Sequence, residues 1–243
     1  MTPPRSSSVA TPGPRRTLAI DIGGSGLKAA IVDEAGRMLT DRVRVETPVG
    51  RPPAEVVAAL TRLVAPLGAY DRVSVGFPGV VRGGRVLTAS NLDHAGWSDF
   101  DLAAALARAL GKPVQVANDA DVQGLAVIAG KGVEMVVTLG TGFGTGLYLD
   151  GRLAPHLELS HHVFRKGETY EEQLGNAARK RVGNRKWNRR VRKAIRTLRA
   201  LTSFDHLYIG GGNARKLDIE LDPDVTVVTN DAGLRGGVAL WRD

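Results

Sequence analysis

Three glycine-rich segments, widely spaced along the chain, each follow a short apolar run. They read DIGGSGLK over 21–28, LGTGFGTG over 139–146 and IGGGN over 209–213. Glycine has no Cβ, so at the end of a strand the backbone can approach an anion closely and point its N–H groups at it. A tight hairpin turn would explain any one of these segments. Three of them in this order favour a site that binds phosphate groups.

A carboxylate and an amide stand side by side after another apolar run, Val114–Ala117. Asp119 follows Asn118 at the start of a predicted helix, which places its side chain at a strand end. A carboxylate there can take the proton from a hydroxyl nucleophile, an effect of roughly 10² to 10⁴ in rate. Asn118 can both donate to and accept from a second hydroxyl group. The plainer alternative is that Asn118 or Asp119 only caps the helix.

Glu158 and His161 form a second polar pair, three residues apart. On a helical turn both side chains would face the same way and could bind adjacent hydroxyl groups. The next residue, His162, has no assigned partner, and a surface or core position is the better interpretation for it.

The elements that position these residues follow one pattern twice. Alternation of Leu18, Ile20 and Ile22 predicts a half-buried strand, and the glycine turn after it leads into a second strand. The first half is predicted as three antiparallel strands, helix, strand, helix and strand, over 17–22, 27–32, 41–47, 52–67, 72–77, 99–110 and 114–117. The second half is predicted as helix 121–129, strand 134–139, glycine turn 140–146, strand 147–150, helical region 170–201 interrupted near Gly183, strands 207–209 and 225–228, and a last helix from about Asp231. The repeated order predicts a duplicated α/β architecture.

Composition excludes several classes of protein. The 243 residues are 43% hydrophobic, enough to bury a core in one large domain or in two lobes. The absence of cysteine excludes disulfides, thiolate zinc sites and cysteine nucleophiles, and it indicates a reducing cytoplasm. Residues 1–16 are rich in Pro, Ser, Thr and Arg and are predicted to be a disordered tail, without the apolar stretch of a signal peptide. No later segment approaches a membrane span.

The net charge of +8 has a local origin. Arg179–Arg199 holds eleven Lys or Arg residues and no acid, and Arg5, Arg15 and Arg16 precede the first strand. Without these cations the rest of the chain carries −6, so a general nucleic-acid binder is not expected. Apolar residues within the basic segment keep near-helical spacing. Two interpretations remain open, an amphipathic helix with a solvated cationic face and a track for a long polyanion such as polyphosphate.

The glycine-rich segments and the motifs between them resemble the ROK family of bacterial sugar kinases, and more closely its polyphosphate or ATP glucokinase branch. The resemblance spans Thr17–Trp241 and is carried by DIGGS at 21–25, GFPG at 76–79, NDA at 118–120, LGTG at 139–142, ELSH at 158–161 and GGG at 210–212. It implies an α/β, actin-like ATPase (ribonuclease H-like) fold with two lobes around a central cleft. The expected lobes are 17–117 and 118–243, with the last helix packing back on the first lobe.

The resemblance also implies a reaction and the residues that perform it. A phosphoryl group would pass from polyphosphate, ATP or both to the 6-hydroxyl of glucose or a related hexose, with Asp119 as general base. The implied sugar-side residues are Gly79, Asn91, Asn118, Asp119, Glu158, His161 and Glu168. The implied phosphate or nucleotide residues are Gly23, Gly24, Ser25, Lys28, Thr141, Gly142, Gly211 and Gly212. Asp21 is expected to hold a hydrated Mg²⁺, and a homodimer is expected.

Some features depart from the family pattern. Most members carry a cysteine cluster that binds structural zinc, and a chain without cysteine is expected to bind none. The insertion that normally sets the register of Glu168 is absent, and Ser160 stands where a glycine is usual. A repressor would carry a helix-turn-helix domain before Asp21, where only the short tail is found. A non-catalytic sugar-sensing or polyanion-binding protein on the same fold is the alternative to a kinase.

Overall fold

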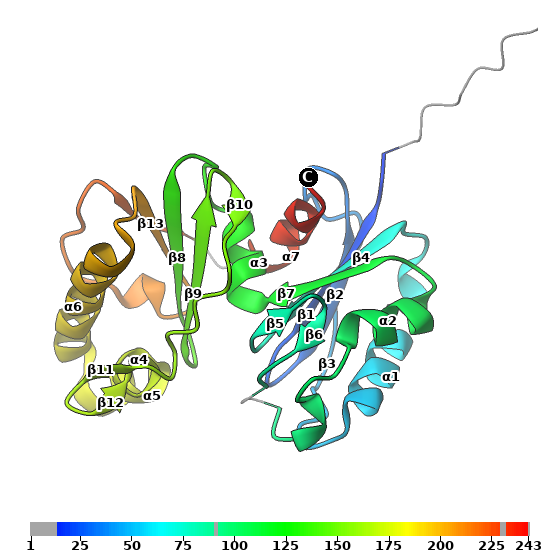
Figure 1. Cartoon of the computed structure of the whole chain (residues 1–243), viewed down its shortest axis with the longest axis horizontal. Coiled ribbons are helices and arrows are strands. Elements are labelled where there is room, and N and C mark those ends of the chain that lie inside the picture. The colour runs from blue at the N-terminus through cyan, green and yellow to red at the C-terminus, as the bar shows by residue number, and fades with distance from the viewer. Residues whose placement is uncertain (1–13, 90–91, 229–231, 243) are drawn as a thin grey trace, which may run out of the picture.

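The computed structural model describes residues 14–89, 92–228 and 232–242, in which two five-stranded sheets stand on either side of the molecule (Figure 1). Most of the expected tail, residues 1–13, and the sugar-side candidate Asn91 lie outside the described residues. Both sheets combine antiparallel and parallel pairs. Within the described residues, no helix is both long and apolar enough to cross a membrane.

The first sheet has the strand order β3-β2-β1-β4-β7. Its strands are β1 (Thr17–Ile22), β2 (Leu27–Val32), β3 (Val43–Val45), β4 (Arg72–Phe77) and β7 (Val114–Asn118). Because β1, β4 and β7 run parallel, their carboxyl ends meet at one edge, where Asp21 pairs with Gly76 and Gly76 with Ala117. This edge receives the first glycine turn and the residues Asn118 and Asp119.

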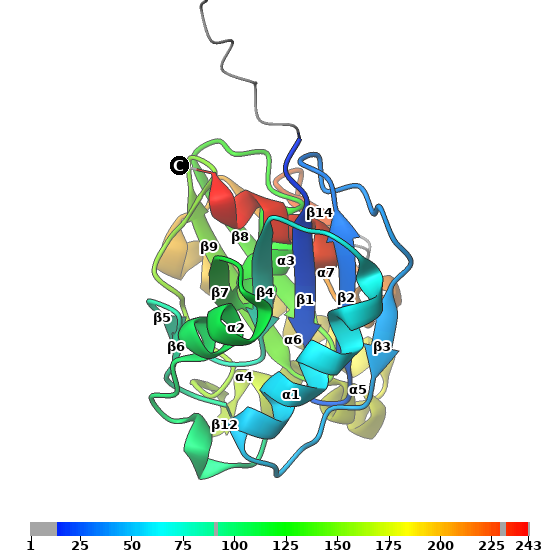
Figure 2. The ribbon, with the colours of Figure 1, turned by 90° about the vertical axis from the view of Figure 1, so that its right-hand side faces the viewer.

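Helices cover both faces of the first sheet. Helices α1 (Pro53–Val64) and α2 (Leu102–Leu110) lie over one face, as Figure 2 shows, and their apolar residues join Leu18, Ile20 and Ile22 in the larger core. Helix α7 (Ala232–Arg235) and the 3₁₀ helix Gly236–Trp241 contact the other face. The end of the chain therefore completes the lobe that its beginning builds.

The second sheet has the strand order β10-β9-β8-β13-β14. Its strands are β8 (Val133–Leu139), β9 (Phe143–Leu149), β10 (Arg152–Leu153), β13 (His206–Gly210) and β14 (Val225–Val227). Helices α4 (Tyr170–Leu174), α5 (Asn176–Val182) and α6 (Asn184–Thr202) pack against this lobe through buried residues such as Trp187 and Val191. The basic segment is thus two helices with a break at Gly183, whose φ is +76°.

Helix α3 (Asp119–Leu125) lies between the two sheets and contacts β4, β8, β9 and the C-terminal helices (Figure 1). Two small hairpins, β5 (Val81–Arg82) with β6 (Arg85–Val86) and β11 (Val163–Arg165) with β12 (Glu168–Thr169), extend the lobes. Further 3₁₀ helices span Ala65–Leu67, Ala95–Trp97 and Ala214–Lys216.

Several element boundaries differ from the sequence prediction; the third strand, predicted over 41–47, spans only Val43–Val45, and the helix predicted over 99–110 begins at Leu102. Two further differences lie beside the site, at β9 and α3. The turn predicted over 140–146 ends before Phe143, and Gly144 and Gly146 lie inside β9. Both positions are crowded, because a Cβ on Gly144 would lie 3.0 Å from Ala120 Cβ and one on Gly146 would lie 3.2 Å from Asp121 Oδ1. These glycines therefore allow β9 to approach α3. The helix predicted over 121–129 is α3, which begins at Asp119 and ends at Leu125.

Candidate active site

A cavity of about 340 Å³ lies between the two lobes. Its lining comes from the turn after β1, the ends of β4 and β7, the turn between β8 and β9, the loop after β10, helix α4 and the turn after β13. The predicted site residues that line it are Gly23, Gly24, Ser25, Gly79, Asn118, Asp119, Thr141, Gly142, Glu158, His161, Gly211 and Gly212. The fold thus brings together most of the residues that the sequence singled out.

Asn118 holds Asp119 in place at the head of α3. Its Oδ1 accepts hydrogen bonds from the backbone N–H of Ala120 (2.8 Å) and Asp121 (3.4 Å), and its Nδ2 donates to Gly79 O at 3.0 Å. The capping interpretation therefore applies to Asn118. The second N–H of the Asn118 side-chain amide takes part in none of these contacts.

Asp119 is half-buried at the cavity wall, as the first residue of α3. Burial, followed by the negative charge of Asp21, raises the pKa of Asp119 to about 7. Gly76 of β4 faces this residue, and a Cβ there would lie 3.4 Å from Asp119 Cα, an ordinary contact distance. A carboxylate with a pKa near neutrality is suited to accept a proton from a hydroxyl group.

Tyr148 of β9 fixes the first turn of α3 from the other lobe. Its hydroxyl donates to Asp121 O at 2.7 Å, and the ring is fully buried. A Cβ on Gly124 would overlap the Tyr148 hydroxyl, so a glycine is needed on the facing side of α3. The orientation of α3, and with it that of Asp119, is therefore set by both sheets.

Asp21 and Lys28 form an ion pair at 2.7 Å beside the first glycine turn. Neither lines the cavity, although the turn that they flank does. No group of three or more His, Asp or Glu side chains in residues 14–89, 92–228 and 232–242 is arranged to hold a metal ion. Mg²⁺ commonly takes only one or two protein carboxylates and completes its shell with phosphate oxygens and water. Asp21 could therefore bind Mg²⁺ only together with the oxygens of a bound phosphate group.

Glu158 lies in the loop after β10 rather than on the helical turn that its spacing with His161 predicted. Its Oε1 accepts from Ser160 N at 2.9 Å, and its Oε2 faces His156 Nε2 at 3.4 Å. Burial opposes ionisation, but the hydrogen bonds from His156 and Ser160 outweigh it and lower the pKa of Glu158. Glu158 is therefore held as a carboxylate, and both it and His161 line the cavity.

Glu168 does not reach the cavity. It lies on β12, where its carboxylate accepts a hydrogen bond from Gln173 and faces Arg181 at 3.6 Å. Glu171, the second residue of α4, lines the cavity instead, and its Oε2 accepts from Ser160 Oγ at 2.8 Å. The two glutamates are three residues apart in sequence, and only the fold distinguishes them. His162 is exposed and does not line the cavity.

The second and third glycine turns pack on each other. Asn213 donates from its backbone N–H to Leu139 O at 2.9 Å and from Nδ2 to Gly140 O at 3.0 Å. Gly211 has φ of +90°, and a Cβ there would overlap Leu139 O. Asn176, at the start of α5, also donates its N–H to Gly140 O at 3.0 Å. These contacts form one glycine-lined wall opposite the turn after β1.

The sequence did not predict three features that shape the site: His156, Glu171, and the hydrogen bond from Ser160 to Glu171. His156 sits two residues before Glu158, and its partner Asp121 sits two residues after Asp119. The sequence signal that could have indicated His156 and Asp121 is that each lies two residues from a candidate site residue.

Comparison with known proteins relates this arrangement to one family. A model of the ROK family matches residues 17–155. The polyphosphate glucokinase of Mycobacterium tuberculosis (strain CDC 1551 / Oshkosh) is 33% identical over 86% of this chain and 83% of its own length. The crystal structure of an inorganic polyphosphate/ATP-glucomannokinase from Arthrobacter sp. strain KM is 33% identical, with a TM-score of 0.82 over 94% of this chain and 100% of that one.

A more distant structure agrees on the fold. The ROK family glucokinase from Streptomyces griseus, solved in complex with glucose and AMPPNP, is 21% identical, with a TM-score of 0.76 over 93% of this chain and 98% of that one. The prediction of an actin-like, two-lobed α/β fold is confirmed.

Proposed function

The chain belongs to the ROK family of sugar kinases, and we propose that it transfers a phosphoryl group from polyphosphate, ATP or both to the 6-hydroxyl of glucose or a related hexose. One observation carries the proposal. Asp119 stands at the head of α3 in a cavity with hydroxyl-binding side chains on one side and three glycine turns on the other.

On the sugar side, Glu158, His161 and Glu171 offer acceptors and donors for hydroxyl groups, and Asn118 offers its remaining N–H. We assign the second sugar-binding glutamate to Glu171 in place of Glu168, because Glu171 lines the cavity. Gly79 is placed beside them by its bond from Asn118. Asn91 keeps its proposed role from the sequence alone.

Asp119 takes the hydroxyl proton as the sugar oxygen forms its bond to phosphorus. The bond from that phosphorus to the bridging oxygen breaks, and the donor leaves as ADP or as a polyphosphate one unit shorter. A sugar hydroxyl is a weak nucleophile at neutral pH, so this proton transfer contributes roughly 10² to 10⁴ in rate. Closure of the lobes would exclude water, which could otherwise take the phosphoryl group.

On the donor side, Gly23, Gly24 and Ser25 would approach the phosphates from the first lobe, and Thr141, Gly142, Gly211 and Gly212 from the second. Lys28 is held at the same end by Asp21. Asp21 and the donor phosphates would hold Mg²⁺, which when bound supplies positive charge to offset that on the transferring group.

We also propose that polyphosphate binds along α5 and α6. Six cations form one stripe on the outer side of α6, which we call the cationic face; they are Arg185, Lys186, Arg189, Arg192, Lys193 and Arg196. All six are exposed, and none forms an ion pair with an acid among the described residues. The helix packs through the opposite side, where Trp187, Val191 and Ile195 are buried.

A short path of side chains joins the cationic face to the cavity. Gly140 O accepts from Asn213, Asn213 Oδ1 accepts from Arg179 Nε at 3.1 Å, and Arg179 Nη1 donates to Asn184 at the start of α6. A polyanion with one end at the glycine turns could therefore continue onto α6. The alternative is that the cationic face is only solvated.

The test is phosphorylation of glucose by the purified protein with Mg²⁺ and either ATP or polyphosphate, at low and high salt. Asp119→Asn is the control, expected to lose turnover while it still binds the sugar. Polyphosphate turnover that falls steeply with salt would support both parts of the proposal. Turnover with ATP alone would leave the cationic face as a solvated surface. No turnover with either donor across a panel of hexoses would favour a sugar-sensing or polyanion-binding protein.

A cytoplasmic location, from the absence of cysteine, and a homodimer, by resemblance to the family, complete the proposal. Sedimentation of the full chain with and without glucose would test the dimer, and a monomer at every concentration would contradict it.

A further inference from the structure

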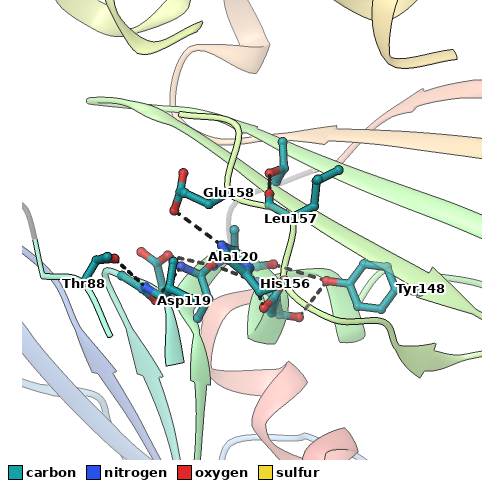
Figure 3. A network of polar contacts seen from close by, with 12 residues as sticks. Thr88, Asp119, Ala120, Tyr148, His156, Leu157 and Glu158 are labelled. Carbon is teal, nitrogen blue, oxygen red and sulfur yellow. Dashed lines mark hydrogen bonds and ion pairs between the residues drawn. The ribbon is translucent and has the colours of Figure 1, made fainter. Parts of the chain in front are cut away.

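His156 lies in the loop after β10 with a carboxylate at each ring nitrogen (Figure 3). Nδ1 is 2.8 Å from Asp121 Oδ2, and Nε2 is 3.4 Å from Glu158 Oε2. The side chain is 7% exposed, and that of Asp121 is 2% exposed. His156 therefore joins α3, which carries Asp119, to the loop that carries Glu158.

While both carboxylates are ionised, the two contacts require an imidazolium; burial raises the pKa of Asp121, and the hydrogen bond from His156 opposes that rise. A neutral imidazole has one N–H donor, whereas an ionised carboxylate can only accept, so donation to both carboxylates needs a proton on each nitrogen. Burial opposes that charge, but the hydrogen bonds to Asp121 and Glu158 outweigh it and raise the pKa of His156 to about 9. The other titratable groups on this side are Asp119 of α3, the Tyr148 hydroxyl of β9 with Glu134 near it, and His161, whose charge acts on Glu158.

The two carboxylates depend on His156 to different degrees. Asp121 Oδ1 is buried without a hydrogen-bond partner, and Asp121 Oδ2 has His156 as its side-chain partner. Glu158 Oε1 is held by Ser160 N, so His156 determines where the other oxygen points. Loss of His156 would leave Glu158 free to rotate beside a cavity in which it must meet a hydroxyl group at hydrogen-bond distance.

We propose that His156 is a positioning residue, which acts through Glu158 by holding its carboxylate at a fixed place relative to Asp119 and so sets the affinity for the hexose. This inference rests on the proposed kinase function. His156 binds neither phosphate turn, so we expect no change in donor affinity on its loss, although its positive charge also acts to lower the pKa of Asp119.

The experiment compares His156→Gln with the full-length wild type. Glutamine can donate to one carboxylate and carries no charge. We expect the KM and the Kd for glucose to rise about tenfold, as for loss of one hydrogen bond between charged groups. The donor KM should stay within about twofold of wild type. His162→Gln is the matched control, because His162 is exposed and lies outside the cavity lining, and it should leave all these constants unchanged.

A second variant keeps the test valid if His156→Gln folds poorly. His156→Gln with Asp121→Asn leaves no buried charge at position 121, so folding no longer depends on the imidazolium. It should fold and should still bind glucose about tenfold more weakly than wild type. Glucose affinity equal to wild type in this double variant would overturn the proposal, as would equal losses in the glucose and donor constants.

The pH dependence separates positioning from mere stabilisation. The Kd for glucose of wild type and of His162→Gln should rise as pH passes about 9, where His156 loses its second proton, and that step should be absent in His156→Gln. A rise in the glucose Kd near pH 9 in His156→Gln as well as in His162→Gln would contradict the inference. If the wild type neither binds nor phosphorylates glucose, the proposed function fails and the inference fails with it. An active wild type with an unaltered His156→Gln variant rejects the inference alone.

Discussion

Ser160 donates its hydroxyl hydrogen to Glu171 Oε2 at 2.8 Å and thereby links the loop after β10 to helix α4, eleven residues further along the chain. Its backbone N–H donates to Glu158 Oε1 at 2.9 Å. One residue thus holds both glutamates that line the sugar side of the cavity. A glycine, which is usual in the family at this position, could supply only the second of these bonds.

Replacement of Ser160 tests that link. Ser160→Ala should raise the glucose KM by roughly three- to tenfold, because a hydrogen bond to a carboxylate is worth about 1.5 kcal/mol or less when the acceptor stays partly solvated. The donor KM should not change. Steady-state kinetics with each substrate varied in turn provides the measurement. Glu168→Gln is the control, since Glu168 lies outside the cavity lining; a larger loss in the control than in Ser160→Ala would contradict the assignment of Glu171.

The acidic side of the pH profile should report Asp119. Because its pKa is raised to about 7, the carboxylate is ionised above that pH and becomes protonated below it. A protonated carboxyl group cannot accept the hydroxyl proton, so kcat should fall as the pH is lowered through about 7. The measurement is kcat at saturating glucose and donor from about pH 5.5 to about 8.5. A flat profile over this range would remove Asp119 from the rate-limiting step.

Gly211 should be intolerant of a side chain. It combines a φ of +90° with a carbonyl, Leu139 O, in the space that a Cβ would occupy. Gly183 has a similar φ of +76°, but nothing lies within 4 Å of its Cβ position. Gly183→Ala should therefore cost only the conformational term, roughly 1 to 3 kcal/mol, because its φ of 76° and ψ of 158° lie in a region that glycine alone adopts readily. Gly211→Ala should cost clearly more and should also weaken donor binding.

Urea unfolding of both glycine variants measures these costs. Equal free energies of unfolding for Gly211→Ala and Gly183→Ala would mean that the contact between the second and third glycine turns is unimportant for stability. A stable Gly211→Ala protein with a raised donor KM would still support the position of the turn in the cavity.

Loss of charge from the cationic face should weaken the binding of polyphosphate but not that of ATP. Arg189→Gln, Arg192→Gln and Arg196→Gln together should raise the KM for long polyphosphate and leave the KM for ATP unchanged. The slope of log KM against log salt should become shallower by about 2 to 3, as expected for three fewer phosphate contacts.

The matched control removes three exposed cations from helices α1 and α2 and the turn that follows, Arg62→Gln, Arg108→Gln and Lys112→Gln. It has the same net charge as the α6 variant but leaves the cationic face intact. An equal change of slope in both variants would show that only the total charge matters, and the proposed track along α6 would be wrong.

Sequence periodicity located most strands and the longer helices because their apolar residues form a face. The inward positions of α6 repeat near 3.6 residues and are buried as predicted. The prediction of a half-buried β1 was wrong, because Ala19 on its other face is covered by Leu234 and Val238. The positions of Gly144 and Gly146 within a strand could not be predicted from the periodicity of apolar residues. They look like part of a turn, but they are required by the approach of α3, which is remote in sequence.

Site residues were predictable where a motif carries them and not where partners come from different segments. Asp119 follows directly from its motif. The distinction between Glu168 and Glu171 depends on where β12 ends and α4 begins, a boundary set by the capping box of Thr169 and Glu172. His156 and Asp121 each lie two residues from a catalytic candidate, but they are 35 residues apart, and no local pattern shows that they form a pair.

The return of the C-terminal segment onto the first lobe has a consequence for the order of folding. Ala19, Ala30 and Val32 are covered by Leu234 and Val238, and Ser74 bonds to Gly237 and Trp241. During synthesis, a chain that has emerged only as far as β7 therefore has nothing to place on that side of its first sheet. Contacts of such sequence separation form late and slow folding. The lobe whose strands are synthesised first therefore becomes complete only after residues 234–241 have emerged, and a nascent chain must keep that apolar surface from aggregating until then.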